Sequence, residues 1–422
     1  MTINQKIAAL LRVEKNEMTQ VIWSFLYFFC VLASYYILRP LREEMGVASG
    51  VDQLHWLFSA VFVVMLLLVP IYGWISSRFP RRKFVPWVYL FFVCNVLAFY
   101  AVFEFVGYAQ LAKRVFFVWV SVFNLFVVSV FWSFMSDIFD TEQAQRLFGI
   151  IAAGGSAGAI TGPILTAALV NNIGVNTLLL LSALLLIGAI FSIGRLLSVL
   201  DTRLSLSRTV IQPKPIGGSV VAGARLVFQS RFLFLIAIYT ILATMSGSIL
   251  YLQQADIVSG LYDRPEQRTQ LFALVDLTVN TITVVLQIFL TGRIVTKFGA
   301  GNAIRILPLL MFAGMSLLSF SPGLGVVLLV QIMRRATAFS IAVPTVNMLF
   351  TVVSPEERYK AKNFIDTVIY RLGDLCSSWM FSFLKASGFG LAIIALIGAI
   401  LGCAWIFVAI VLGKEFEKRR QF

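Results

Sequence analysis

The sequence has few of the side chains on which most enzymes and metal centres depend. It contains one histidine, His55, and four cysteines that stand singly within apolar runs. Isolated cysteines of this kind are small buried hydrophobes, so we expect neither a disulfide framework nor a metal site. A phosphate-binding loop of the form GxxxxGK(S/T) does not occur, which argues against an ATP-driven pump. We therefore expect a protein that is not an enzyme and that uses no metal and no cofactor.

Charged residues are also scarce, at 13% of the chain, whereas 59% of the residues are hydrophobic and the mean hydropathy is +0.89. Runs of about 20 apolar residues are long enough to cross a bilayer as helices, and the chain contains many of them. Residues 1–19 are polar and show no signal-peptide pattern. The sequence predicts an all-α integral membrane protein that is surrounded by the lipid bilayer.

Twelve transmembrane helices are predicted, and a polar interval divides them into two groups of six. The spans lie at roughly 20–40, 54–76, 84–105, 115–136, 147–170, 175–200, 231–252, 269–292, 303–320, 324–350, 362–385 and 389–412. Prolines and glycines interrupt the interval 201–230, as is typical of a flexible cytoplasmic linker. We therefore predict an N-terminal six-helix bundle over residues 1–200 and a C-terminal bundle over residues 231–422.

The 34 basic residues outnumber the 20 acidic ones, and their positions explain the excess. Most of them fall in alternate loops, on the side that holds both termini. The opposite side carries only Lys113, Arg114, Arg264, Arg268 and Lys385. This asymmetry places both termini in the cytoplasm, and it accounts for the net charge of +14 without nucleic acid as a partner. We expect a monomer in a bacterial inner membrane.

Two loops repeat one pattern at corresponding places in the two halves. The segment 73–82 follows the second predicted span, and the segment 292–299 follows the eighth. Each has a glycine, three further residues, a polar residue, a base, and a turn residue two positions later. The pair resembles the loop signature of the major facilitator superfamily, although Ser77 and Thr296 stand where an acidic residue is usual and Pro80 replaces a glycine. The resemblance implies the fold of that superfamily.

The end of the first span is rich in charge. Tyr35, Arg39 and Arg42 are spaced i, i+4 and i+7, so they share one helix face, and Glu43 lies where it can pair with Arg39. Charges at membrane depth usually mark a solute pathway. The alternative is that the helix ends at Arg39 and that the charges lie among lipid headgroups.

Small and polar residues mark two further spans. Gly154, Gly158 and Gly162 repeat every four residues, which permits close helix contact. The ending with Gly158, Gly162 and Pro163 looks like the fifth-helix motif of antiporters in the superfamily. In the eighth span, Asp276, Asn280, Thr283 and Gln287 form a polar stripe. Such a stripe is expected to face an interior cavity, with hydrogen bonding between helices as the alternative.

The tenth and eleventh spans hold a second centre of charge. Arg334 and Arg335 are neighbours and cannot share a face, so one of them is expected to point into the cavity, and the sequence leaves open which.

In the eleventh span, Asp366, Tyr370 and Asp374 are spaced as one face, and Arg371 lies three residues before Asp374. Structural ion pairing is the alternative to a role in transport, because buried charges are paired in either case.

These segments resemble the ATP/ADP translocases, the nucleotide exchangers of plastids and obligate intracellular bacteria. Residues 335–345 and 362–373 look like their tenth and eleventh helices, and residues 38–43 look like their first-helix segment, with Arg42 at the place of a functional lysine. The chain departs from the family at Asp374, where a second functional lysine is expected. It departs again at Gln253 or Gln254, where a glutamate is expected.

We predict a secondary transporter that moves an anionic small solute by alternating access, in the form of nucleotide or phosphorylated-metabolite exchange. Guanidinium groups suit phosphate and carboxylate. The predicted substrate-binding residues are Tyr35, Arg39, Arg42, Asn280, Arg335, Tyr370 and Arg371. The predicted coupling or ion-pairing residues are Glu43, Asp276, Asp366 and Asp374. The alternative function is a proton-coupled symporter or an exporter of another small molecule.

Overall fold

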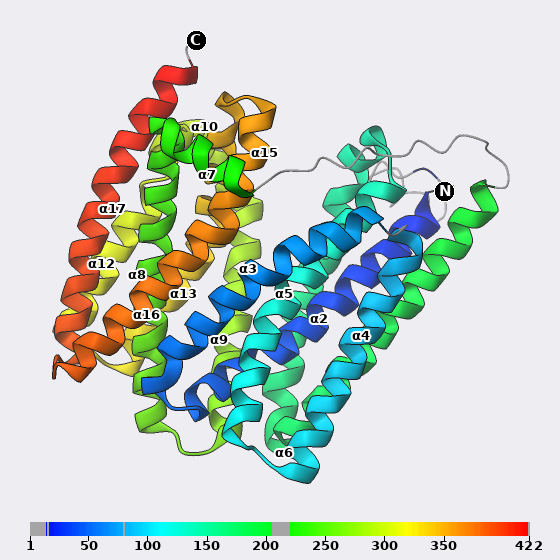
Figure 1. Cartoon of the computed structure of the whole chain (residues 1–422), viewed down its shortest axis with the longest axis horizontal. Helices are drawn as coiled ribbons and strands as arrows, with labels where there is room; N and C mark the ends of the chain where they lie inside the picture. Colours follow the sequence, from blue (N-terminus) through cyan, green and yellow to red (C-terminus); the bar gives the residue numbers. More distant parts are fainter. Residues whose placement is uncertain (1–13, 15–16, 79–80, 205–219, 421–422) are drawn as a thin grey trace. The chain divides into compact units, whose positions relative to one another are not determined.

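The computed structural model of the chain describes residues 14, 17–78, 81–204 and 220–420, and its regular structure over those ranges is entirely helical (Figure 1). The α-helices are α2 (Met18–Ala48), α3 (Leu54–Arg78), α4 (Arg81–Ala101), α5 (Gln110–Ile138), α6 (Thr141–Leu204), α7 (Val220–Gln229), α8 (Arg231–Leu261), α9 (Pro265–Leu286), α10 (Gly292–Phe298), α11 (Ala300–Ala303), α12 (Ile306–Phe320), α13 (Leu324–Thr337), α14 (Val343–Leu349), α15 (Pro355–Phe364), α16 (Tyr370–Ala386) and α17 (Leu391–Arg420).

Short turns of other geometry join some of these helices. Turns of the 3₁₀ type are η1 (Val51–Gln53) and η5 (Phe350–Val352). Turns of the π type are η2 (Val102–Val106), η3 (Gln287–Thr291), η4 (Ala338–Ala342) and η6 (Ile365–Ile369). A π turn inserts an extra residue into a helix and rotates the residues after it, and such turns are frequent at functional sites.

Ten helical stretches in the described part are long and apolar enough to cross a membrane. One of them, Glu142–Val199, has 58 residues and is interrupted at Gly174. There φ is +77°, a backbone conformation that glycine adopts at no steric penalty, so the stretch holds two of the predicted spans. The prediction of an all-α membrane protein is confirmed, and the number of twelve spans stays a prediction.

The chain forms two compact units, each assembled from three segments. Unit 1 comprises Met1–Gly46, Leu68–Pro215 and Arg264–Leu277, and unit 2 comprises Val47–Leu67, Ile216–Asp263 and Thr278–Phe422. Helices α2, α3 and α9 therefore each pass from one unit into the other. Residues 205–219, most of the predicted linker, lie outside the described residues, and the rest of that interval forms the end of α6, the helix α7 and Ser230. The predicted division into residues 1–200 and 231–422 stays a prediction.

Unit 1 is built on close contact between α2 and α6. A Cβ atom added at Gly154, Gly158 or Gly162 would lie 2.4–2.7 Å from a backbone carbonyl oxygen of α2, so only glycine allows this approach. The predicted close contact at these glycines is confirmed. Aromatic rings fill the adjoining core, where the Tyr27 hydroxyl donates to the Tyr89 hydroxyl over 2.8 Å.

Unit 2 has an equivalent arrangement. Gly398 and Gly402 on α17 pack against Met315 and Phe312 on α12, and Gly373 on α16 packs against Thr244 on α8. These contacts hold α17 against α12 and α16 against α8. The polar side chains of these helices are therefore carried on backbones that lie close together.

Candidate functional site

The charged end of α2 presents a stripe of partly exposed side chains in unit 1. Tyr35, Arg39 and Arg42 are half-buried, whereas Leu38 and Leu41 between them are fully buried. The alternation agrees with the predicted shared face. The helix does not end at Arg39 but continues to Ala48, through Pro40.

Arg39 forms an ion pair with a residue far away in the sequence. Its Nη1 lies 3.5 Å from Oδ1 of Asp276, near the middle of α9, and their side chains are 19% and 4% exposed. The ring of Tyr36 lies 5.8 Å from the guanidinium carbon. A guanidinium has five N–H donors, so one contact of this length leaves donors of Arg39 available to an anion.

Arg42 is positioned by three neighbours. Its Nε donates to the Ser121 hydroxyl over 3.0 Å, its Nη1 donates to Glu43 over 2.8 Å, and its guanidinium carbon lies 4.0 Å from the centre of the Phe117 ring. The predicted pairing of Glu43 with Arg39 is therefore wrong. Glu43 binds its neighbour Arg42 because Asp276 already occupies Arg39 from another helix.

A second ion pair joins α2 to the start of α9. The Nε and Nη2 of Arg268 donate to the two carboxylate oxygens of Glu44, over 2.5 and 2.9 Å, and the two side chains are 12% and 2% exposed. The Gln270 amide also donates to the Ala167 carbonyl over 3.1 Å. Together with the Arg39 pair, these contacts hold the segment 264–277 within unit 1, just before α9 passes into unit 2.

The polar stripe of α9 is largely buried. Asp276, Asn280 and Thr283 are 3–8% exposed. Gln287 differs, because it lies in the π turn η3, is exposed, and donates to the Phe339 carbonyl over 3.3 Å. The stripe thus ends at Thr283, and Gln287 connects α9 to the turn η4.

Among the described residues of unit 2, Asp374 on α16 is the buried acidic side chain. It accepts a hydrogen bond of 2.6 Å from the Ser248 hydroxyl on α8 and lies 3.3 Å from Nη1 of Arg371. Its side chain is 12% exposed and that of Arg371 is 24% exposed. The pairing between Arg371 and Asp374 follows the predicted spacing of three residues.

Two buried amides of α8 lie near the end of that helix. Gln253 and Gln254 are at most 4% exposed, and the Gln253 amide donates to the Leu391 carbonyl. Among the described residues, neither Oε1 atom has a hydrogen-bond partner. A buried acceptor without a donor raises the free energy of the folded state by about 1–3 kcal/mol, so the packing of α8 must offset that cost.

Arg334 and Arg335 point to different surroundings. The Nε of Arg334 donates to Gln331 over 3.4 Å, and its guanidinium lies against Gly247 of α8 so closely that a Cβ there would meet Nη1 at 2.4 Å. Arg335 is the more buried of the two, at 6% exposure.

Asp366 and Tyr370 do not join Asp374. Asp366 forms an exposed ion pair with Lys362 at 2.7 Å, and Tyr370 is 44% exposed with its ring 5.5 Å from Arg371. The prediction that Asp366, Tyr370 and Asp374 share one face is wrong. The physical reason is the π turn at Ile365–Ile369, which changes the number of residues per turn between them.

Sequence reasoning missed the partnership of Glu44 and Arg268. The available signal was topological, because Glu44 follows the first predicted span on the side of the membrane where Arg268 is one of few cations. It also missed the Trp379 indole, which donates to the Ser59 hydroxyl over 3.0 Å and lies 4.4 Å from the His55 ring in unit 2. In the part of the chain that the structure describes, no three His, Cys, Asp or Glu side chains gather in a way that could hold a metal ion.

Comparisons with known proteins give a consistent result. The family described as the Major Facilitator Superfamily matches residues 24–374. A curated relative, ADP,ATP carrier protein 2 of Chlamydia pneumoniae, is 22% identical over 98% of this chain and 91% of its own length. This similarity confirms the resemblance to ATP/ADP translocases.

Solved structures share the fold at low identity. A bacterial homologue of the iron transporter ferroportin, in an inward-facing state, is 14% identical with a TM-score of 0.64 over 94% of this chain and 98% of its own. The nucleoside transporter NupG gives 14% and 0.63 over 94% and 100%. A D-xylose-proton symporter gives 15% and 0.64 over 94% and 97%.

Proposed function

Because the chain belongs to the Major Facilitator Superfamily and is a multi-pass membrane transporter rather than an enzyme, we propose that its solute is a small anion bound through Arg39 and Arg42. We further propose that it works by alternating access in a bacterial inner membrane, with both termini in the cytoplasm. The observation that carries the proposal is the ion pair between Arg39 and Asp276.

Arg39 suits an anion because its charge is neutralised but its donors are not consumed. Asp276 is almost fully buried, whereas Arg39 keeps a fifth of its side chain exposed. A charge at membrane depth raises the energy of a protein unless it is paired, and such charges mark solute pathways. A phosphate or carboxylate can bind the exposed side of the guanidinium, where bidentate hydrogen bonds are strong.

Arg42 adds a second guanidinium beside that of Arg39, on the half-buried stripe that begins at Tyr35. Ser121 and Glu43 hold two of its nitrogens, so the guanidinium is fixed before a solute arrives. A donor that is ordered in advance loses less entropy when it binds.

Binding of an anion at Arg39 also provides a mechanism for coupling. The anion competes with Asp276 for the guanidinium, and Asp276 lies two residues before α9 enters unit 2. Loss of that ion pair weakens the attachment of the segment 264–277 to unit 1. Solute binding and rearrangement of α9 are then linked, as alternating access requires.

The specific form of this proposal is exchange of a nucleotide or another phosphorylated metabolite. The ADP,ATP carrier protein supports it through similarity along nearly the whole chain. The acidic Asp374 and the amides Gln253 and Gln254 set this chain apart from the translocase pattern, so the phosphate contacts rest on α2.

The test is exchange in liposomes that contain the purified protein, with ATP, ADP, sugar phosphates, inorganic phosphate and dicarboxylates offered in turn. Arg39→Gln and Arg42→Gln should each weaken apparent affinity for the exchanged anion by roughly 10- to 150-fold, the equivalent of one charged hydrogen bond. Arg264→Gln is the matched control, because its side chain is 75% exposed. Exchange limited to neutral or cationic solutes would refute the proposal.

A second candidate is proton-coupled transport, and the hydrogen bond between Ser248 and Asp374 favours it. A buried carboxyl that pairs with Arg371 and a hydroxyl can release or take up a proton when its surroundings change. Under this candidate, Asp374→Asn abolishes uptake driven by a pH gradient while leaving exchange at equal pH intact. Uptake that is insensitive to the gradient in the unmodified protein would eliminate it.

A further inference from the structure

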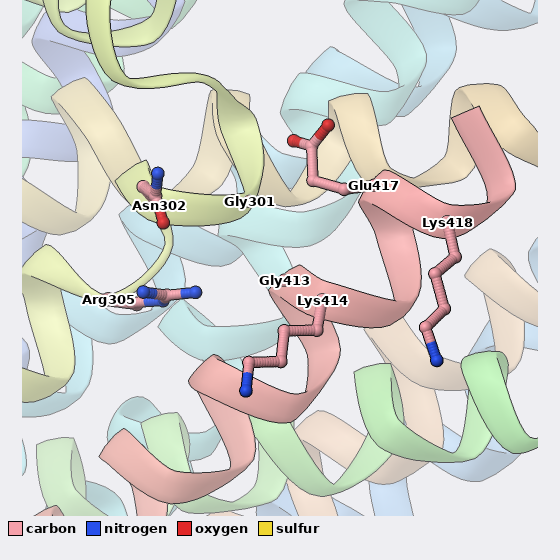
Figure 2. A pocket seen from close by; sticks show the side chains of 7 residues that line it. All are labelled: Gly301, Asn302, Arg305, Gly413, Lys414, Glu417 and Lys418. Carbon is pink, nitrogen blue, oxygen red and sulfur yellow. The ribbon is translucent and has the colours of Figure 1, made fainter. Parts of the chain in front are cut away.

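A basic pocket lies between the start of α12 and the end of α17, within unit 2. It has a volume of about 270 Å³ and is lined by Gly301, Asn302, Arg305, Gly413, Lys414, Glu417 and Lys418 (Figure 2). Three cations and one carboxylate give the lining a net charge of +2. The pocket contains none of the residues proposed to bind the transported solute.

Two glycines shape the pocket by letting two backbones touch. A Cβ atom at Gly413 would lie 2.2 Å from the Gly301 carbonyl oxygen, and one at Gly301 would lie 3.0 Å from the Gly413 carbonyl oxygen. This contact joins α11 to α17 and leaves the longer side chains around it, where Arg305 extends toward α17 (Figure 2).

Arg305 is incompletely satisfied. Its Nε atom is buried and has no hydrogen-bond partner in the part of the chain that the structure describes. Lys414 and Lys418 are exposed and project from α17 beside the same pocket. A buried guanidinium donor and two ammonium groups that line one pocket are groups suited to binding a phosphate.

The position of the pocket along the helices indicates where that phosphate comes from. The apolar stretch of α12 begins at Ile306, directly after Arg305, and the apolar stretch of α17 ends at Gly413, directly before Lys414. Both helices therefore change from apolar to charged at the pocket, which is the depth of lipid headgroups. Basic pockets between transmembrane helices at this depth bind anionic lipid headgroups.

We propose that this pocket binds the phosphodiester of an anionic phospholipid, with Arg305 and Lys414 as the main contacts. The acyl chains extend along the exposed apolar surface of α12, where Leu309 and Phe312 are 51% and 38% exposed. Bound lipid fastens α12 to α17 at the end that the charge asymmetry of the loops assigns to the cytoplasm. Glu417 lies on the same rim and disfavours a ligand with more than one exposed negative charge.

The test uses the full-length protein in detergent and follows thermal unfolding during titration with phosphatidylglycerol. Phosphatidylethanolamine and inorganic phosphate serve as the other two ligands. Phosphatidylglycerol should raise the unfolding temperature with saturation, and Arg305→Gln or Lys414→Gln should raise the half-saturating concentration about tenfold. Arg293→Gln is the matched control, since its side chain is exposed, in the same unit and outside the pocket.

Native mass spectrometry provides a second measurement that does not depend on stability. The unmodified protein and Arg293→Gln should retain phosphatidylglycerol, and Arg305→Gln should lose it. Equal retention by all three proteins would overturn the assignment to this pocket. In the thermal titration, a rise in unfolding temperature with inorganic phosphate but not with phosphatidylglycerol would overturn the lipid as the source of the phosphate. No rise with either ligand would overturn the proposal, because the pocket would then be a hydrated basic surface only.

Discussion

The ion pair between Arg39 and Asp276 allows a structural role to be separated from a role in transport. Asp276→Asn leaves the Arg39 guanidinium as an uncompensated charge, and Arg39→Gln leaves a carboxylate that is 4% exposed without its cation. Breaking a buried pair in this way destabilises a protein by about 3–5 kcal/mol. We expect the lower end for Asp276→Asn, because Arg39 is itself 19% exposed.

The double variant Arg39→Gln/Asp276→Asn should recover most of that loss, because neither charge is then buried alone. Its apparent affinity for the exchanged anion should nevertheless stay as low as in Arg39→Gln, since the guanidinium that binds the anion is absent. In Asp276→Asn the anion has no competitor for Arg39, so the exchanged solute should raise the unfolding temperature more than it does in the unmodified protein.

The assays are thermal unfolding in detergent, followed by tryptophan fluorescence, and anion exchange in liposomes. Asp366→Asn is the control, because the pair with Lys362 has side chains that are 55% and 37% exposed and should change stability by less than about 1 kcal/mol. Single variants as stable as the unmodified protein would refute the buried pair. A double variant that exchanges anions at the normal rate would refute Arg39 as a binding residue.

Three further predictions test other contacts. Arg268→Gln should lower the free energy of unfolding by about 3 kcal/mol in chemical denaturation, and Glu44→Gln in the same chain should restore most of it, because Glu44 is 2% exposed. Burial disfavours the charged form of Glu17, but hydrogen bonds to Arg146 and Gln143 outweigh this and lower its pKa below the ordinary value of 4.5. Its contribution to stability is therefore fully present above about pH 4.5 and lost as the pH falls through the lowered pKa, and Glu17→Gln should remove this part of the pH dependence of unfolding. Gly373→Ala should cost about 1–3 kcal/mol in thermal unfolding, because the new Cβ overlaps the Thr244 hydroxyl, and Thr244→Ala should relieve it.

Each of these has an outcome that would contradict it. A loss at Arg268→Gln that the second substitution does not restore would mean that the arginine acts through another partner. An unchanged pH dependence in Glu17→Gln would show that a different carboxyl titrates there. A Gly373→Ala protein of normal stability would show that α8 and α16 can separate slightly without penalty.

The residue pattern within single helices was enough to predict the membrane spans and the part of the candidate site on α2. The apolar runs predicted the membrane spans, and the i, i+4, i+7 spacing predicted the stripe of Tyr35, Arg39 and Arg42, because a continuous α-helix fixes both. The pair of Arg371 and Asp374 was predictable for the same reason, since both residues lie within one regular helix.

The identity of partners from distant segments could not be predicted from the sequence. Arg39 pairs with Asp276 rather than with the nearby Glu43, and the choice depends on how α9 packs against α2. The shared face of Asp366 and Asp374 failed because a π turn has no simple signature in sequence, and it separates two residues that ideal helix geometry would align.

The proline in α3 gives two of the connections between the units, those through α3 and α9, unequal stiffness. Helix α3 passes from unit 2 into unit 1 between Leu67 and Leu68, and Pro70 lies just beyond that point. Proline has no N–H to donate to the carbonyl four residues earlier, so α3 can bend there with little elastic resistance. Helix α9 has no proline at its own crossing and is fastened by two ion pairs. The connection through α3 therefore bends more easily than the connection through α9. Helix α9 resists bending for as long as Asp276 and Arg268 keep their ion pairs with α2.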